Sequence, residues 1–338
     1  MTRITVLAGG VGGARFVRGL LAHLARASSR RTDGTDVQVT VVANTGDDMW
    51  LNGLRVCPDL DTIMYTLGGG VDENQGWGRS EDTQRASAEI MAYGRGWDWF
   101  TLGDLDLGTH IVRTDMLREG FTLTQATEAL CRRWRPGVRL LPMSDQSVET
   151  HVRLGLETDY HQADDLIHFE EWWVRYRAAV PVTEFVQVGL EQAAATPEVI
   201  EAIGTAEAIV LPPSNPVVSV GTILALPGVR EALGRTPAQV VGLSPIIGGT
   251  AVRGMAEQCL ATIGIDATAL GVAGFYGARS RGGVLDGWLM DDVDAEYLPA
   301  LEGQGIRGAT APLWMSDIDA TASMASTVLA MASSGFAP

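Results

Sequence analysis

The chain has 338 residues, a formal net charge of −16 and 46% hydrophobic residues, which is enough for a sizeable core. This negative charge, without a basic cluster, argues against binding to nucleic acid or to an anionic membrane surface. All 25 basic residues are arginine, so Schiff-base chemistry and a P-loop lysine are excluded.

The three cysteines, Cys57, Cys131 and Cys259, lie far apart and form no C-x-x-C pair. This spacing argues against a disulfide framework or a zinc knuckle and fits a reducing compartment. No apolar run reaches the roughly 18 residues that a membrane-spanning helix needs. The N-terminus shows no signal-peptide pattern. We therefore expect a cytoplasmic protein.

The first predicted strand, residues 4–7, leads into a run with four glycines in residues 9–13, and a helical pattern begins at Phe16. Successive glycines can turn backbone N–H groups toward an anion, and the following helix adds its positive dipole end. Arg15 stands where the G-x-G-x-x-G dinucleotide fingerprint requires its third glycine. The layout favours a phosphate cradle, and a tight strand-to-helix turn without a ligand is the alternative.

A polar loop is predicted at residues 30–36, followed by a buried parallel strand at residues 37–43, which are almost continuously apolar. This strand ends in the polar residues 44–48. Ligands bind outside the carboxyl ends of the strands in open parallel sheets, so these residues are expected beside the glycine run. A helix is predicted to begin at Pro58 and to end at the glycines of residues 68–70.

Residues 71–180 are interpreted as an insertion that covers the sheet rather than extending it. Its expected elements are short helices near residues 81–93, 109–118 and 122–134, a polar turn at 101–106, and strands at 138–141 and 148–154 with a turn between them.

The later part of the chain returns to an α/β pattern. Strands are predicted at 208–211, 240–243, 283–289 and 307–311, and helices at 252–263 and 320–332. The fold class is therefore α/β, a Rossmann-like and mostly parallel sheet flanked by helices, with a largely helical insertion covering the site. Because no repeat or low-complexity linker is present, residues 1–338 are expected to form a single discontinuous domain.

Four aspartates, Asp47, Asp48, Asp59 and Asp61, form the sharpest group of candidate functional residues. Carboxylates beside a phosphate cradle repel the ligand unless a cation lies between them, and Mg²⁺ binds one or two carboxylates together with substrate phosphates. We therefore predict Asp48 and Asp61 to be Mg²⁺ ligands and catalytic residues. Asp47 and Asp59 are expected to be structural, as a turn cap and a helix N-cap.

Other polar residues have two readings each. Ser214 and Asn215 suit a second phosphate or a ribose, or they belong to a proline-stiffened turn. Arg15 and Arg113 could each clamp a phosphate through two hydrogen bonds, although most arginines lie on solvated surfaces. His110 is either a ligand contact or a structural histidine.

Several of these segments occur in an order that resembles the 2-phospho-L-lactate transferase family. They are residues 7–15, 44–50, 58–62, 102–113, 141–145, 213–216 and 244–248. The resemblance extends over nearly the whole chain. Actinobacterial members of the family are the phosphoenolpyruvate transferases of deazaflavin coenzyme biosynthesis. The lysine-free composition resembles those members.

The resemblance implies transfer of a phosphoenolpyruvyl or 2-phospho-L-lactyl group from a guanosine diphosphate-linked donor to the ribityl hydroxyl of the deazaflavin FO, with release of GMP. Asp61 would also orient or deprotonate that hydroxyl. The expected partners are FO, the guanylated donor and a second copy of the chain in a homodimer. Thr101 stands where archaeal members carry a lysine that contacts FO. The substrate-binding positions are Gly10, Val11, Gly12, Gly13, Arg15, Asn44, Thr45, Thr101, His110, Arg113, Ser144, Ser214, Asn215 and Gly248.

Two other function classes remain as alternatives. The related gluconeogenesis-factor branch binds nucleotide sugars and is regulatory, but it typically has a Pro-Gly-Asp segment where this chain has residues 58–61. An NAD-dependent oxidoreductase would need the glycine fingerprint that Arg15 interrupts. Both observations favour the transferase.

Overall fold

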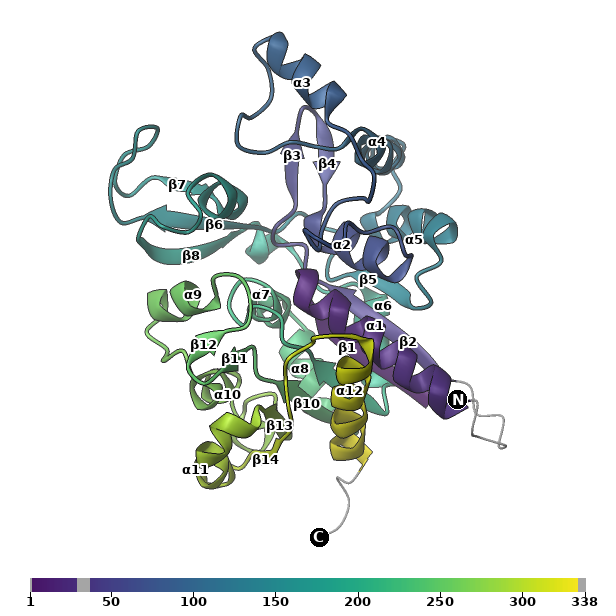
Figure 1. Cartoon of the computed structure of the whole chain (residues 1–338), viewed down its shortest axis with the longest axis vertical. Coiled ribbons are helices and arrows are strands. Elements are labelled where there is room, and N and C mark those ends of the chain that lie inside the picture. Colours follow the sequence, from purple (N-terminus) through teal and green to yellow (C-terminus); the bar gives the residue numbers. More distant parts are fainter. Residues whose placement is uncertain (1, 29–36, 334–338) are drawn as a thin grey trace.

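The computed structural model describes residues 2–28 and 37–333, so the polar loop predicted at 30–36 lies outside the described residues. Its centre is a sheet of seven parallel strands (Figure 1). In spatial order these are β14 (Arg307–Thr310), β13 (Gly287–Met290), β10 (Gln239–Leu243), β9 (Ala208–Leu211), β1 (Thr2–Ala8), β2 (Val37–Ala43) and β5 (Arg139–Pro142).

The strand order reverses direction between β1 and β9. From β1 the chain continues to β2 and β5 on one side, and then returns to place β9, β10, β13 and β14 on the other side. This is the doubly wound order, in which ligands bind at the reversal point, outside the carboxyl ends of the strands. The predicted α/β class with a mostly parallel sheet is confirmed.

Helices cover both faces of the sheet because successive strand residues point to opposite sides. One core contains Val6, Val41 and Val210, and the other contains Leu7, Val42 and Ile209. The first is covered by α1 (Gly10–Ser28), α2 (Pro58–Leu67) and α12 (Ile318–Ser333), and α1 and α12 lie side by side in Figure 1. The second is covered by α6 (Pro197–Gly204), α7 (Val220–Ala225), α8 (Val229–Arg235), α9 (Ala256–Thr262), α10 (Ala269–Tyr276) and α11 (Leu298–Gln304).

The predicted insertion contains the three expected helices, α3 (Arg85–Ala92), α4 (Asp104–Arg118) and α5 (Leu123–Trp134). The expectation that it does not extend the sheet is wrong at β5, because the apolar residues of this strand pair in parallel with β2, Leu141 opposite Val42. The two strands expected around residue 145 therefore belong to different sheets, since β6 (Glu149–Leu154) pairs with β7 (Leu166–His168) and β8 (Val182–Val188).

The prediction of a polar turn at residues 101–106 is also wrong for residues 104–106, which belong to α4. Gly103 is the N-cap of α4, and Asp104 and Asp106 lie in the first turn of the helix. Carboxylates are favourable there because they face the positive end of the helix dipole. The consequence is that Asp106 shares a helix with His110 and Arg113.

The remaining elements are short. They are the hairpins β3 (Met49–Leu51) with β4 (Leu54–Val56) and β11 (Ile246–Ile247) with β12 (Thr250–Ala251), the π-helical turn η1 (Glu171–Arg175), and the 3₁₀ turns η2 (Leu190–Gln192), η3 (Arg279–Arg281) and η4 (Asp292–Tyr297). Across residues 2–28 and 37–333, none of the helices combines the length and the apolar composition needed to cross a bilayer.

Candidate active site

The glycine run and the segment after β9 meet at the reversal point of the sheet. The Ser214 hydroxyl donates to the Gly9 carbonyl at 2.8 Å and accepts from the Gly9 amide at 3.1 Å. The helix begins earlier than the predicted start at Phe16, because α1 begins at Gly10. The run is therefore the first turn of this helix, held by Ser214.

Close packing explains part of the glycine requirement. A Cβ at Gly12 would lie 2.5 Å from the Pro213 carbonyl oxygen, and one at Gly13 would lie 2.9 Å from the Ser214 hydroxyl. Gly10 has a φ of +49°, which side chains disfavour. These glycines thus let the segment after β9 approach α1 closely. The phosphate cradle stays a prediction beside this structural role.

Asp59 lies at the N-terminus of α1. Its carboxylate accepts a hydrogen bond from the Asn44 side-chain amide at 2.9 Å and another from the Gly10 backbone amide. The Asn44 carbonyl oxygen in turn accepts from the Gly46 amide at 2.9 Å. Burial raises the pKa of Asp59 to about 6 despite these bonds. The predicted N-cap role of Asp59 is wrong, because Cys57 is the N-cap of α2 and Asp59 lies inside the first turn of that helix. Its carboxylate instead accepts from the first residue of α1.

The buried turn after β2 carries polar atoms without hydrogen-bond partners. These atoms, among the described residues, are Thr45 Oγ1, Asp47 Oδ1 and both carboxylate oxygens of Asp48. Burial raises the pKa of Asp48 to about 7, against the charge of Arg55, whose guanidinium lies 3.5 Å away. Unsatisfied buried oxygens of this kind cost free energy unless a ligand or cation occupies the position.

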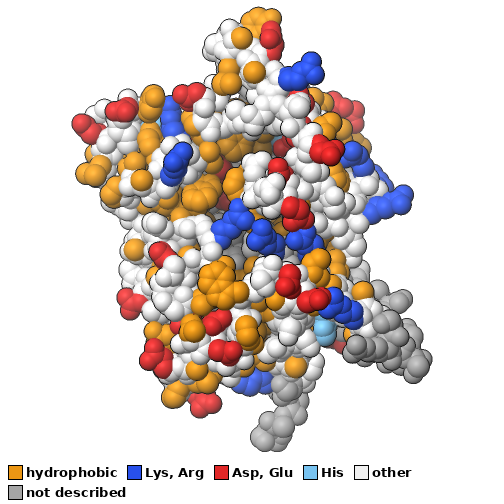
Figure 2. Space-filling view, viewed as in Figure 1, with side chains coloured by type: hydrophobic (Ala, Val, Ile, Leu, Met, Phe, Trp, Pro, Cys, Tyr) orange, Lys and Arg blue, Asp and Glu red, His pale blue; other side chains and the backbone are white. Residues whose placement is uncertain are grey.

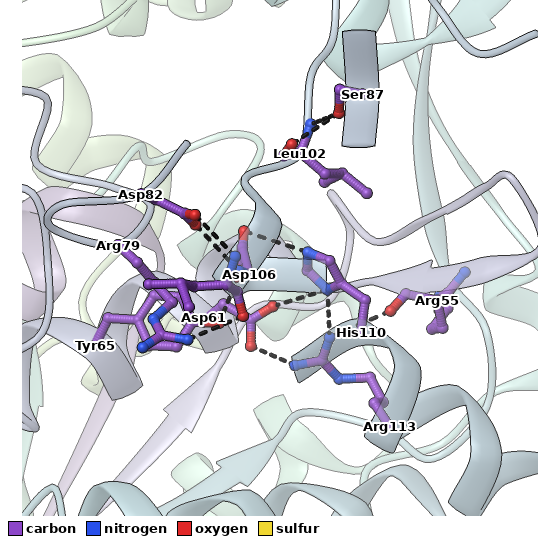
Figure 3. A network of polar contacts seen from close by, with 11 residues as sticks. Arg55, Asp61, Tyr65, Arg79, Asp82, Ser87, Leu102, Asp106, His110 and Arg113 are labelled. Atoms are coloured by element: carbon purple, nitrogen blue, oxygen red, sulfur yellow. Dashed lines mark hydrogen bonds and ion pairs between the residues drawn. The ribbon is translucent and has the colours of Figure 1, made fainter. Parts of the chain in front are cut away.

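Asp61 lies one turn inside α2 and faces three residues of α4 (Figure 3). Arg113 donates a hydrogen bond to its Oδ1, and His110 Nδ1 lies 3.6 Å from its Oδ2. Oδ2 itself has no hydrogen bond. Burial is the largest effect on Asp61 and raises its pKa, while the charge of Arg113 opposes the increase.

Asp106 completes this network. Its carboxylate lies 3.3 Å from His110 Nε2 and accepts a hydrogen bond from the Tyr65 hydroxyl. Burial raises the pKa of Asp106, but the bonds from His110 and Tyr65 outweigh it and leave the pKa below the ordinary value. Sequence reasoning missed Asp106, Tyr65 and Arg55. The spacing of Asp106, four residues before His110, was a signal for one helix face.

Arginines gather near the start of α1. Figure 2 shows arginine side chains in a hollow in the middle of this face of the molecule. Partial burial and then the charge of Arg15 lower the pKa of Arg253, so these two guanidiniums lie near each other. Gly76 lies between Val11 and Arg253, with both side chains 3.0 Å from the position its Cβ would take. This pair suits an anionic ligand beside the glycine run.

Besides Asn44, His110 and Arg113, four more of the predicted substrate-binding residues have polar groups engaged within the protein. The Ser144 hydroxyl donates to the Ala194 carbonyl at 2.9 Å. The Asn215 carbonyl oxygen accepts from the amides of residues 217 and 218 at 2.9 and 3.2 Å. The Gly248 amide donates to the Asp294 carboxylate at 3.2 Å. Ser214, as described above, is bonded to Gly9. Their roles toward a substrate stay predictions.

Thr101 lies apart from the carboxylates, on the loop before α4. It lines a pocket of about 10 Å³ together with Asn52, Trp97 and Phe100. This volume holds about one water molecule, so it is too small for a flavin-like ring. A contact between Thr101 and FO stays a prediction, and it would require the ring to lie against the outside of this pocket.

The comparisons with known proteins find relatives over nearly the whole chain. A phosphoenolpyruvate transferase of Streptomyces griseus is 56% identical over 330 residues, which are 98% of each chain. A phosphoenolpyruvate transferase of Mycolicibacterium smegmatis is 52% identical over 323 residues, 95% of this chain and 96% of that one. A crystal structure of a Bacillus halodurans protein covers 97% of this chain with a TM-score of 0.62 and 17% identity, which shows the fold.

The doubly wound sheet with this site and these relatives define the protein as an enzyme of the transferase class. The model of the family described as 2-phospho-L-lactate transferase CofD matches residues 4–330. The chain belongs to this family, as the sequence resemblance indicated.

Proposed function

We propose that the protein transfers a phosphoenolpyruvyl group from a guanosine diphosphate-linked donor to the terminal ribityl hydroxyl of FO, releasing GMP. The observation that carries the proposal is the meeting of three features at the reversal point of the sheet. These are the first turn of α1, the buried carboxylate of Asp48, whose oxygens accept no hydrogen bond, and Oδ2 of Asp61, which also accepts none. An anionic diphosphate needs hydrogen-bond donors such as the backbone amides of a helix N-terminus, and an attacking hydroxyl needs a carboxylate that can orient it or accept its proton.

The reaction is a substitution at phosphorus. The hydroxyl oxygen of FO forms a bond to the phosphorus nearer the three-carbon acid, and the bond from this phosphorus to the oxygen of GMP breaks. GMP leaves with the electron pair of that bond. The free Oδ2 of Asp61 accepts the hydroxyl proton, since Oδ1 is engaged by Arg113.

Arg15 and Arg253 are suited to bind the diphosphate, because their charges lie near each other at the start of α1. The N-terminal turn of α1 adds its dipole in the same place. The anionic donor thereby meets positive groups before it approaches the buried carboxylates.

The residues also fit a bound Mg²⁺. Both oxygens of Asp48 and Oδ2 of Asp61 are buried and have no hydrogen bond, and carboxylate oxygens are the ligands that Mg²⁺ takes. When bound, the ion would neutralise charge on the transferred phosphate. Asp48 and Asp61 are the residues that would hold it. Oδ2 of Asp61 has two lone pairs, so one would face the ion while the other faces the acceptor hydroxyl.

The enolpyruvyl donor is favoured over the lactyl one because the relatives at 52–56% identity are named phosphoenolpyruvate transferases. The homodimer and the cytoplasmic location expected from the sequence remain part of this proposal.

The proposal is tested by incubating the protein with FO, Mg²⁺ and each guanylated donor in turn, and measuring product masses. We expect an adduct of FO with phosphoenolpyruvate, formed with one GMP per adduct. An adduct formed only from the lactyl donor would reassign the donor. Binding of UDP-N-acetylglucosamine without binding of FO would overturn the transferase proposal in favour of the regulatory alternative.

A further inference from the structure

Three residues on one face of α4 form a chain of contacts that ends at Asp61. Asp106, His110 and Arg113 are spaced by four and three residues, so their side chains lie on the same side of the helix. Figure 3 shows His110 and Arg113 directed toward the Asp61 carboxylate, and Asp106 joined to the other nitrogen of the His110 ring. His110 and Arg113 are each 1% exposed, and the polar atoms of both side chains face groups of the protein itself.

The chemistry of the guanidinium fixes the direction of these hydrogen bonds. Arg113 can only donate, so His110 Nδ1, which lies 3.1 Å from Arg113 Nη1, must be an acceptor. The ring proton is then on Nε2. This nitrogen lies 3.3 Å from the Asp106 carboxylate, at ion-pair distance but outside hydrogen-bond geometry, so the charge of Asp106 is what favours a proton there. The same Nη1 donates to the Arg55 carbonyl at 3.2 Å, and Nη2 donates to Asp61.

We propose that Asp106 and His110 are positioning residues that orient the Arg113 guanidinium, and through it the catalytic carboxylate of Asp61, instead of contacting the substrate. Asp106 selects the tautomer of His110, and that tautomer presents a lone pair to Arg113. Arg113 then holds Oδ1 of Asp61 and leaves Oδ2 free for the acceptor hydroxyl. This role rests on the proposed function, because it assigns a purpose to the orientation of Asp61.

A cation site is the main competing interpretation of the same residues. Single ligand atoms of Asp61, Asp106 and His110 all lie within 4.8 Å of one another. However, the bond from Arg113 engages Asp61 and His110, and the bond from Tyr65 engages Asp106. A cation would have to displace these donors, so we favour the positioning role and include the cation as an outcome of the test.

The first test reads the tautomer directly, without the reaction. Nitrogen-15 NMR of the full-length protein, with the His110 signals assigned by their loss in His110→Asn, should show the proton on Nε2. Diamagnetic Mg²⁺ should leave the proton on Nε2, and the signals of His161 on the β6–β7 loop serve as the control. A proton on Nδ1, or loss of the Nε2 proton when Mg²⁺ is added, would overturn the proposal.

The second test compares two amides at the same position. The oxygen of Asn can take the place of His Nδ1 and accept from Arg113, whereas the amide of Gln reaches the place of Nε2 and leaves Arg113 without an acceptor. We expect His110→Gln to lower kcat by about tenfold or more, with KM for FO unchanged, and His110→Asn to retain more of the activity.

Asp115→Asn is the matched control, because Asp115 is an exposed carboxylate of the same helix. It should leave kcat, KM and thermal stability unchanged. If His110→Asn and His110→Gln lose kcat equally, and in proportion to the fall in their melting temperatures, then His110 has only a structural role. A rise in KM for FO at constant kcat would mean a direct substrate contact. Either result contradicts the positioning role.

Failure of the inference and failure of the proposed function are distinguishable. If the wild-type protein forms no adduct with FO, the proposed function is wrong, whatever the tautomer. If it forms the adduct but His110 carries its proton on Nδ1, only the positioning role is wrong.

Discussion

Arg113 and Asp61 form a buried ion pair between α4 and α2, with side chains that are only 1% and 7% exposed. This pair joins the insertion to the helix that follows the polar turn after β2. It gives Asp61 an unequal environment, with one oxygen bonded and the other free. The insertion therefore helps to build the site as well as to cover it.

The first prediction concerns the stability of this pair. Arg113→Leu should lower the free energy of unfolding by about 3–5 kcal/mol, because it leaves the carboxylate of Asp61 buried without its counter-charge. Urea denaturation followed by circular dichroism measures this change. Arg132→Leu, at a side chain 68% exposed on α5, is the matched control and should change stability by no more than about 0.5 kcal/mol. Equal effects in the two variants would contradict the buried pair.

The second prediction compares a glycine that is required for close packing with a glycine that is not. Gly12→Ala should destabilise the protein by about 1–3 kcal/mol, because the new methyl group would lie 2.5 Å from the Pro213 carbonyl oxygen. Gly108→Ala in α4 meets nothing within 4 Å and should stabilise by up to about 1 kcal/mol through helix propensity. Thermal denaturation compares the melting temperatures of the two variants with that of the wild type. Unchanged stability in Gly12→Ala would show that the segment after β9 does not pack as closely as described.

Much of the sheet could be predicted from the sequence. Buried parallel strands are nearly continuous apolar runs, so β2 and β9 were located at the observed residues. The glycine run, Asp48 and Asp61 follow from the same kind of local signal, since strand ends carry ligand sites in this class of fold, and their roles stay predictions. These signals are local, and each is contained in a few neighbouring residues.

The contacts that organise the site could not be predicted in the same way. Ser214 and Gly9 are 205 residues apart in the sequence, and no local pattern predicts the hydrogen bond between them. The sequence predicts that the insertion only covers the sheet, whereas its strand β5 forms the edge of that sheet. The pairing of β5 with β2 depends on the path of the whole insertion, which no local pattern shows. Asp106 was placed in a turn because one acidic residue at a helix start is equally compatible with a loop.

The third prediction concerns pH. Burial, followed by the charge of Asp59, raises the pKa of Glu170 from 4.5 to about 8. Between these values the folded protein holds a proton that the unfolded chain releases, so stability should fall as pH rises from about 5 to 8. Glu170→Gln cannot ionise and should reduce this decline. Urea denaturation at several pH values measures the free energy of unfolding of both proteins. The same dependence of this free energy on pH in wild type and in Glu170→Gln would contradict the raised pKa.

The fourth prediction concerns Mg²⁺. Asp48→Asn should weaken Mg²⁺ binding at least about tenfold in calorimetric titrations with GDP present, because the amide removes a charged ligand. Because burial raises the pKa of Asp48 to about 7, Mg²⁺ should also bind the wild-type protein more tightly as pH rises through 7. Asp319→Asn, at a side chain 78% exposed, should bind like wild type. Wild-type affinity in Asp48→Asn would remove Asp48 from the metal site.

The central claim is that the carboxylate of Asp61 acts on the hydroxyl that attacks phosphorus. Asn at this position keeps an oxygen for Arg113 but cannot take a proton. The most direct measurement is therefore the single-turnover rate of FO adduct formation in Asp61→Asn, with Asp115→Asn as control. We predict a loss of about 10²-fold or more in the first variant and the wild-type rate in the second. A wild-type rate in Asp61→Asn would contradict the account.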